Sequence, residues 1–148
     1  MIDEKASPEF CMEIIPTEDE IDELGHVSNV AYVRWIQDIA KAHSAAIGLD
    51  HATYERIGKV FVVRKHEVEY LAPAFLGERI VLFTHVAGWK GATSERRTRI
   101  VRQKNGQELA RAVTLWAFVS KTNGRPRRID RDVIHAFRQP PSAMASGG

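Results

Sequence analysis

Hydrophobic residues recur every three or four positions between residues 32 and 47 of this chain. The apolar side of this pattern is formed by Tyr32, Trp35, Ile36, Ile39, His43, Ala46 and Ile47. This spacing places them on one stripe of an α-helix. Ser28 or Asn29 suits the start of the helix, because a short polar side chain accepts hydrogen bonds from first-turn amides, and Gly48 marks its end. The pattern therefore predicts one long helix that is buried on one side.

Most of the remaining chain has the composition of β-strands. A short run, FCMEII at residues 10–15, precedes the helix. Longer runs rich in β-branched and aromatic residues follow at residues 60–71, 79–87, 94–103 and 108–120. Turn-forming residues separate these runs, and Asn105-Gly106 is the strongest hairpin signal among them. The pattern predicts an antiparallel meander, with the last run apolar on both faces and therefore inside the sheet.

One strand, one long helix and four further strands predict an α+β fold in which an antiparallel sheet of about five strands wraps around one central helix. The chain has 148 residues, a length that suits one domain. We expect that domain to span residues 1–138 and to end in a short helix within residues 129–138. Residues 139–148, QPPSAMASGG, are expected to form a tail without fixed structure.

Composition and charge exclude several classes of protein. Hydrophobic residues make up 44% of the chain and charged residues 27%, as in soluble globular proteins, and no apolar run is long enough to span a membrane. The acidic first ten residues do not resemble a secretory signal, so we expect a cytoplasmic protein. Cys11 has no second cysteine for a disulfide and no ligands at metal-binding spacing. No metal and no cofactor are expected.

A distinctive stretch, DELGHVSNVAYVRW at residues 22–35, places an acid, a glycine and a histidine just before the helix, and a later strand ends in EYLAPA. These residues strongly resemble the hotdog-fold acyl-CoA thioesterases of the 4-hydroxybenzoyl-CoA thioesterase type. Asp22, Gly25 and Tyr32 match the family pattern by position. The resemblance implies a hotdog fold and the hydrolysis of acyl-CoA thioesters to a free acid and coenzyme A.

The resemblance also implies roles for the matching residues. Asp22 attacks the thioester carbonyl as a nucleophile or activates a water as a general base, and the sequence leaves both routes open. The backbone amide of Tyr32 is implied as the main oxyanion donor, in keeping with the positive end of a helix. Gly25 lets the loop turn sharply and lets the acyl group approach the backbone. Glu20 stands where many relatives carry a further aspartate and is the nearest rival acid.

Four further polar residues, two near the start of the helix and two on a later strand, have two interpretations each. His26 is a candidate proton shuttle or substrate contact, and its alternative is a hydrogen-bonded structural role. Asn29 is a candidate substrate contact, although a helix cap explains it better. Arg64 and His66 alternate onto one face of a strand, where they would line the active-site cleft or an interface.

A basic turn and strand supply candidates for binding coenzyme A. Lys90 and Gly91 lie in the turn GWKGAT, ahead of an arginine-rich strand. In the family, basic residues around this turn meet the phosphates of coenzyme A, so Lys90 is the strongest candidate. For Arg97 and Arg99, a solvated strand face is the better explanation.

Other functions and the expected partners follow from the same residues. A non-catalytic acyl-CoA binding or sensing module of the same fold is the alternative function, and the presence of Asp22 argues against it. Dehydratases of this fold use a D-x-N-P-x-H type loop, which is not found here. The net charge of +2, and an arginine-rich strand without aromatic residues, argue against nucleic-acid binding. We expect an acyl-CoA substrate, no membrane partner, and a homodimer or homotetramer, since a lone sheet leaves an open edge.

Overall fold

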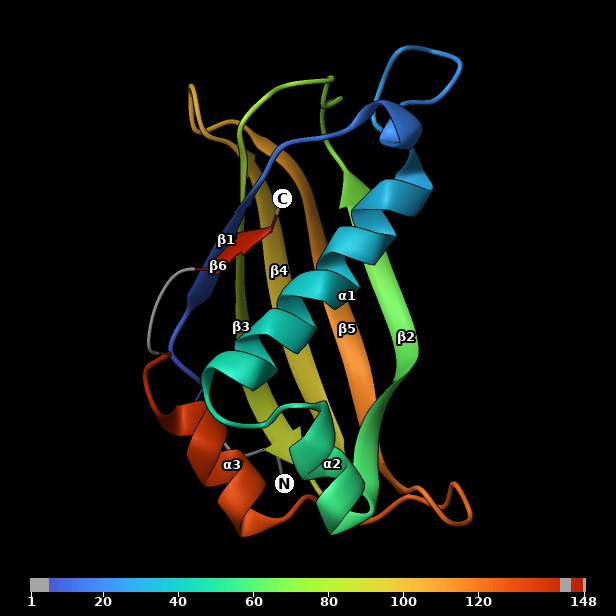
Figure 1. Ribbon diagram of the computed structural model, residues 1–148, viewed down its shortest axis with the longest axis vertical. Coiled ribbons are helices and arrows are strands. Elements are labelled where there is room, and N and C mark those ends of the chain that lie inside the picture. Colours follow the sequence, from blue (N-terminus) through green and yellow to red (C-terminus); the bar gives the residue numbers. More distant parts are fainter. Residues whose placement is uncertain (1–5, 142–144, 148) are drawn as a thin grey trace.

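The computed structural model describes residues 6–141 and 145–147 as one curved sheet with a long helix packed across it (Figure 1). Five antiparallel strands form most of the sheet: β1 (Phe10–Ile14), β2 (Lys59–Tyr70), β3 (Ile80–Lys90), β4 (Thr93–Arg102) and β5 (Glu108–Ser120). Their order is β2-β5-β4-β3-β1, and the short β6 (Ala145–Gly147) pairs in parallel with β1. The predicted α+β architecture, one sheet around one long helix, is confirmed.

The strand order differs from the predicted meander at one strand. β3, β4 and β5 are consecutive neighbours, but β2 pairs with β5, with His66 opposite Thr114. The segment 71–79 therefore crosses the end of the sheet to reach β3 (Figure 1). Turn-forming residues reveal where strands end, but they do not reveal which neighbour a strand joins. This crossing brings residues 71–78 beside the start of the long helix.

The long helix α1 (Asn29–Ala46) forms as the apolar stripe predicts. Ser28 is its cap, because the Ser28 Oγ accepts a hydrogen bond from the Ala31 N–H at 3.2 Å, whereas Asn29 is the first helical residue. The helix packs on the inner face of the sheet, and each large apolar side chain that it buries contributes about 1.5–3 kcal/mol. Its buried residues are Ala31, Tyr32, Trp35, Ile36, Ile39, Ala40, His43 and Ser44.

Two shorter helices lie at the opposite end of the sheet from the start of α1 (Figure 1). α2 (His51–Ile57), which Asp50 caps, was not predicted, because none of its residues is fully buried and its seven residues are too few for a clear apolar periodicity. α3 (Arg131–Arg138) forms where the final helix was predicted and buries Val133 and Phe137. These two side chains join a second apolar cluster with Leu49, Val86, Trp89, Phe118 and Ile129.

The C-terminal segment differs from the expected tail at three residues. β6 pairs Ala145 with Met12 and Gly147 with Ile14. Residues 142–144 and 148 of the expected tail lie outside the described residues. In the part of the chain that the structure describes, no helix has the length and apolar character needed to cross a membrane.

Candidate active site

The loop before α1 is a tight hairpin with Asp22 at its base. Ile21 and Val27 form an isolated antiparallel bridge, and the Asp22 N–H donates a hydrogen bond to the His26 carbonyl at 2.8 Å. The Gly25 N–H donates to the Asp22 carbonyl at 3.0 Å, and Gly25 has a φ of 80°, a conformation that favours glycine. The hairpin places Asp22 opposite His26. His26 is two residues before the helix cap Ser28, a distance of roughly 7 Å along an extended chain.

The Asp22 carboxylate is held at one oxygen and open at the other. Oδ1 accepts hydrogen bonds from the Leu24 N–H at 2.9 Å and the His26 N–H at 3.3 Å. Oδ2 accepts none from the described residues, and the side chain is exposed. A carboxylate that is oriented by backbone amides and keeps one free oxygen is suited to act as a nucleophile or a general base.

The first turn of α1 presents two free amides close to this loop. The N–H groups of Asn29 and Val30 donate to no described residue, whereas the Ala31 N–H donates to Ser28. The Tyr32 N–H, predicted as the oxyanion donor, already donates to the Ser28 carbonyl at 3.3 Å. Because α1 begins three residues before Tyr32, the free amides belong to the first two helical residues. These two groups lie at the positive end of the helix, where an anion is favoured.

Glu20, the rival acid, has a structural role. Its buried carboxylate accepts hydrogen bonds from the Thr17 N–H at 2.9 Å, Arg34 Nη2 at 2.9 Å and Trp35 Nε1 at 2.8 Å. Burial raises the pKa of Glu20, but these donated hydrogen bonds outweigh it and leave the pKa below its usual value. The carboxylate therefore ties the loop to α1 and is not free to react.

Residues 71–78, the crossing segment, pack against the Asp22 loop. The His26 ring packs edge-on against Phe75, with 5.5 Å between ring centroids, and the Val27 N–H donates to the Ala74 carbonyl at 2.9 Å. The His26 side chain makes no hydrogen bond to the described residues, so it is open to a substrate contact. Exposed apolar side chains on these segments and at the helix start are Leu24, Val30, Tyr70, Leu71, Phe75 and Leu76.

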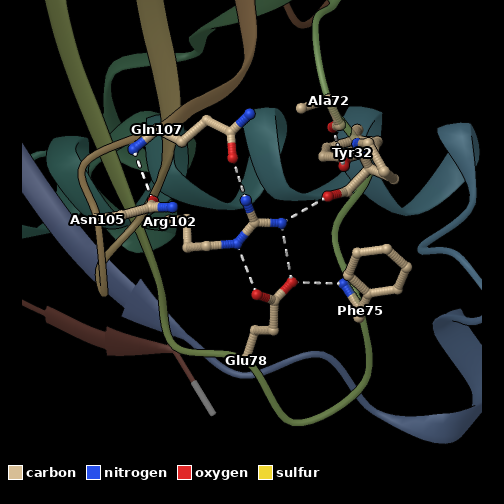
Figure 2. Close-up of polar contacts among 8 residues, drawn as sticks. Tyr32, Ala72, Phe75, Glu78, Arg102, Asn105 and Gln107 are labelled. Carbon is tan, nitrogen blue, oxygen red and sulfur yellow. Dashed lines mark hydrogen bonds and ion pairs between the residues drawn. The ribbon is translucent and has the colours of Figure 1, made fainter.

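An ion-pair network holds the crossing segment in place (Figure 2). Arg102 Nε on β4 lies 2.6 Å from Glu78 Oε2, and Arg102 also donates to the Pro73 carbonyl at 2.8 Å and to the Gln107 side chain. Glu78 accepts a hydrogen bond from the Phe75 N–H at 2.8 Å. The Arg102 hydrogen bonds lower the pKa of Glu78. One arginine of the basic strand thus shapes the border of the site.

Lys90 and Gly91 lie at the other end of the sheet from Asp22. Ile14, which precedes the Asp22 loop, pairs with Ile80 at the start of β3, whereas Lys90 is the last residue of β3. Lys90 lies ten residues along β3 from Ile80, which corresponds to about 33 Å of extended strand. Lys90 is exposed and makes no ion pair with a described residue. Within one chain, Lys90 and Gly91, which were predicted to bind coenzyme A, therefore lie far from Asp22.

Arg64 and His66 occupy different environments on β2. Arg64 is exposed at an irregularity between Val63 and Lys65, and this bulge breaks the alternation that predicted a shared face. The His66 ring faces α1 and β5, with Nδ1 2.9 Å from the Thr114 Oγ1 and Nε2 3.4 Å from the Gln37 amide nitrogen. Burial lowers the pKa of His66.

The arginines of β4 divide between its two faces. Arg97 pairs with Glu95 at 3.0 Å and Arg99 with Glu9 at 3.7 Å on the solvated face, as predicted. Arg96 points the other way and is buried, a position that was not predicted from the sequence. Strict alternation along residues 94–100 was the signal that would have placed it on the inner face.

The remaining candidate chemistry concerns metals and the lone cysteine. Within residues 6–141 and 145–147, no group of three or more His, Cys, Asp or Glu side chains is arranged to hold a metal ion. Cys11 is half-buried in β1, and burial, followed by the charge of Glu9, raises the pKa of its thiol. The thiol is therefore protonated at neutral pH and is a poor nucleophile.

Comparison with known proteins finds related sequences. The family model of the thioesterase-like superfamily matches residues 15–137. The acyl-CoA thioester hydrolase YbgC of Escherichia coli O6:H1 is 33% identical over 79 residues, which are 53% of this chain and 58% of that protein. This chain therefore matches little more than half the length of the curated relatives.

Solved structures share the fold over most of the chain. A DHNA-CoA thioesterase from Staphylococcus aureus has a TM-score of 0.80 at 22% identity, covering 87% of this chain and 88% of its own. A variant of a 4-hydroxybenzoyl-CoA thioesterase, complexed with 4-hydroxybenzoyl-CoA, has a TM-score of 0.79 at 19% identity, covering 87% and 98%. Identities this low establish the fold alone. The predicted hotdog fold is confirmed.

Proposed function

This chain belongs to the thioesterase-like superfamily, and on that premise we propose that it hydrolyses acyl-CoA thioesters to a free acid and coenzyme A. One observation carries the proposal: an exposed Asp22 carboxylate, oriented by two amides, precedes a helix whose first two amides are free. Thioester hydrolysis needs a nucleophile or an activated water together with donors for the carbonyl oxygen. The resemblance to an acyl-CoA thioester hydrolase supports the same reaction.

Each part of the proposed site has a chemical task. The free oxygen of Asp22 attacks the thioester carbonyl carbon, or it takes a proton from a water that attacks. Negative charge then develops on the carbonyl oxygen, and the amides of Asn29 and Val30 stabilise it. Collapse of this intermediate breaks the carbon–sulfur bond and releases coenzyme A. In the nucleophilic route, water then cleaves the anhydride formed on Asp22.

A panel of acyl-CoA esters tests the proposed reaction directly. The purified protein is incubated with short, medium, long and aromatic acyl-CoA esters, and free thiol is measured over time. We expect release above the uncatalysed rate for at least one member, and the preferred member identifies the acyl group. No release from any ester by folded protein would contradict the proposed hydrolysis.

Replacing Asn29 with proline tests the role of its amide. Proline lacks the N–H but suits the first position of a helix, and Ser28 has the extended backbone that a residue before proline adopts. We expect kcat to fall by about 10- to 100-fold with little change in Tm, since one of two oxyanion donors is lost. Asn29→Ala keeps the amide and removes the side chain, and it should retain kcat. An unchanged kcat in Asn29→Pro would remove this amide from the mechanism.

We further propose that the active unit is a homo-oligomer. β2 is an edge strand in the described chain, and its exposed side chains include Val62 and Tyr70. An open edge of this length invites pairing with another strand. Because Lys90 lies far from Asp22 in one chain, a coenzyme A molecule that contacts both residues would bind across two copies.

Lys90→Ala tests the proposed contact with coenzyme A. We expect KM for acyl-CoA to rise by about three- to tenfold with kcat unchanged, because a contact to the remote nucleotide binds ground and transition states equally. The difference should shrink as salt is added and for an acyl-pantetheine substrate that lacks the nucleotide. Lys104→Ala removes the same charge elsewhere and should change neither constant. Equal KM for Lys90→Ala and wild type at low salt would rule the contact out.

A further inference from the structure

A cavity near the C-terminal half of α1 contains a buried arginine. It has a volume of about 470 Å³ and lies between α1, α2, the sheet and the end of α3. This size falls in the range of small-molecule sites. The side chains that make its walls mostly apolar include Ala40, Ala45, Leu49, Val60, Phe61 and Phe137.

The Arg96 guanidinium in this cavity has no counter-ion. Its residue is only 4% exposed, and Nη1 donates to His43 Nδ1 at 2.9 Å and to the Thr84 Oγ1 at 3.2 Å. The guanidinium lies over the Phe137 ring, 5.7 Å from its centroid. Nε and Nη2 donate to no described residue, and no described carboxylate lies within ion-pairing distance. Two donors in a fixed fork are therefore left for another molecule.

The surroundings keep Arg96 charged and unpaired. Burial, followed by the charge of Arg96, lowers the pKa of His43 to about 3, so the imidazole is neutral and accepts the hydrogen bond. Burial lowers the pKa of Arg96 to about 10, so the guanidinium still carries its charge at neutral pH. A buried charge without a partner is unfavourable for the fold, and folding alone therefore does not account for it.

We propose that this cavity binds a free organic carboxylate with an apolar body, with the carboxylate on Nε and Nη2 of Arg96. The planar guanidinium fork matches the two oxygens of a carboxylate, and the apolar walls match a hydrocarbon body. One buried cation balances a monoanion, whereas a phosphate dianion would call for more. Lys41 and Asp50 also line the cavity; their charges are opposite to each other, and both side chains are exposed to solvent.

Calorimetry on the wild-type protein tests the charge of the ligand. Butyrate, octanoate, dodecanoate and benzoate are titrated at neutral pH, each beside the alcohol of the same carbon skeleton. We expect at least one carboxylate to bind, and its alcohol to bind about tenfold more weakly, since the alcohol cannot pair with the guanidinium. Binding needs no turnover, so the result is independent of the proposed hydrolysis.

Two variants test whether Arg96 holds the carboxylate. Arg96→Met should weaken carboxylate binding about tenfold and leave alcohol binding unchanged, which a general loss of structure would not do. Arg97→Met removes the same charge from the solvated face of the same strand and should bind both ligands as wild type does. Circular dichroism establishes that each variant is folded.

Three results would overturn the proposal. They are no binding by any carboxylate of the panel, equal affinity of wild type for a carboxylate and its alcohol, and equal weakening by Arg96→Met and Arg97→Met. If Arg96→Met fails to fold, the wild-type comparison of carboxylate with alcohol decides the matter alone.

Discussion

Asp22→Asn should lower kcat by about 100- to 10,000-fold while the protein keeps its fold, because the variant lacks the only free carboxylate oxygen that the proposed mechanism uses. The asparagine side-chain oxygen can still accept hydrogen bonds from the amides of Leu24 and His26, so the loop geometry is retained. Thiol release under saturating acyl-CoA gives kcat, and thermal unfolding followed by circular dichroism checks the fold.

Glu23→Gln is the matched control for this substitution. Glu23 is the next residue along the loop, is exposed and makes no hydrogen bond or ion pair within the described chain, so its amide should leave kcat unchanged. Full turnover in Asp22→Asn would disprove the assignment of Asp22. Wild-type protein that binds acyl-CoA tightly without releasing thiol would instead favour a binding or sensing module.

Glu20→Gln should lower the stability of the fold rather than the rate of the proposed hydrolysis. The amide cannot accept from Thr17, Arg34 and Trp35 as a carboxylate does, and it leaves the Arg34 charge without its partner. We expect the free energy of unfolding to fall by about 1–3 kcal/mol, measured by urea denaturation at neutral pH. Turnover per folded molecule should stay near that of wild type. Glu18→Gln, on the exposed side of the same turn, should change neither quantity.

The effect of Glu20→Gln should depend on pH. The pKa of Glu20 is lower in the folded protein than its usual value of 4.5, so its contribution to stability is complete above that value. The contribution is lost as pH falls through the folded pKa, because the protonated carboxyl no longer forms the charged hydrogen bonds. The stability difference between wild type and Glu20→Gln should therefore shrink in acid. A difference that stays constant down to pH 3 would contradict this role.

Periodic elements were predictable from the sequence because burial leaves a repeating pattern. The stripe through Tyr32 and Ile39 predicted α1, and the runs of β-branched residues predicted five strands. α2 was not predictable in this way, because none of its seven residues is fully buried and only Tyr54 and Ile57 pack partly against the second apolar cluster. The pairing of β2 with β5 depends on contacts between distant parts of the chain, and no local pattern carries it.

The sequence pointed to the acids and the glycine of the Asp22 loop but did not separate their roles. The sequence presents Glu20 and Asp22 as neighbouring acids, and only the hydrogen bonds from Arg34 and Trp35 separate a structural carboxylate from an available one. The free amides belong to Asn29 and Val30 because Ser28 caps the helix ahead of its apolar stripe. Arg96 was left in its arginine-rich strand without an assigned face, although the alternation along residues 94–100 would have placed it on the inner one.

The crossing segment gives the proposed site a border that can evolve separately from the sheet. Residues 71–78 lie outside the paired strands of the sheet. Arg102 holds their backbone through its ion pair with Glu78 and its hydrogen bond to the Pro73 carbonyl. The exposed side chains of Leu71 and Leu76 can therefore be exchanged without altering strand register, whereas Phe75 also contacts His26 of the Asp22 hairpin. On the proposed function, a natural or engineered descendant of this protein has in this stretch a place to change its acyl group while Asp22 and the helix amides stay constant.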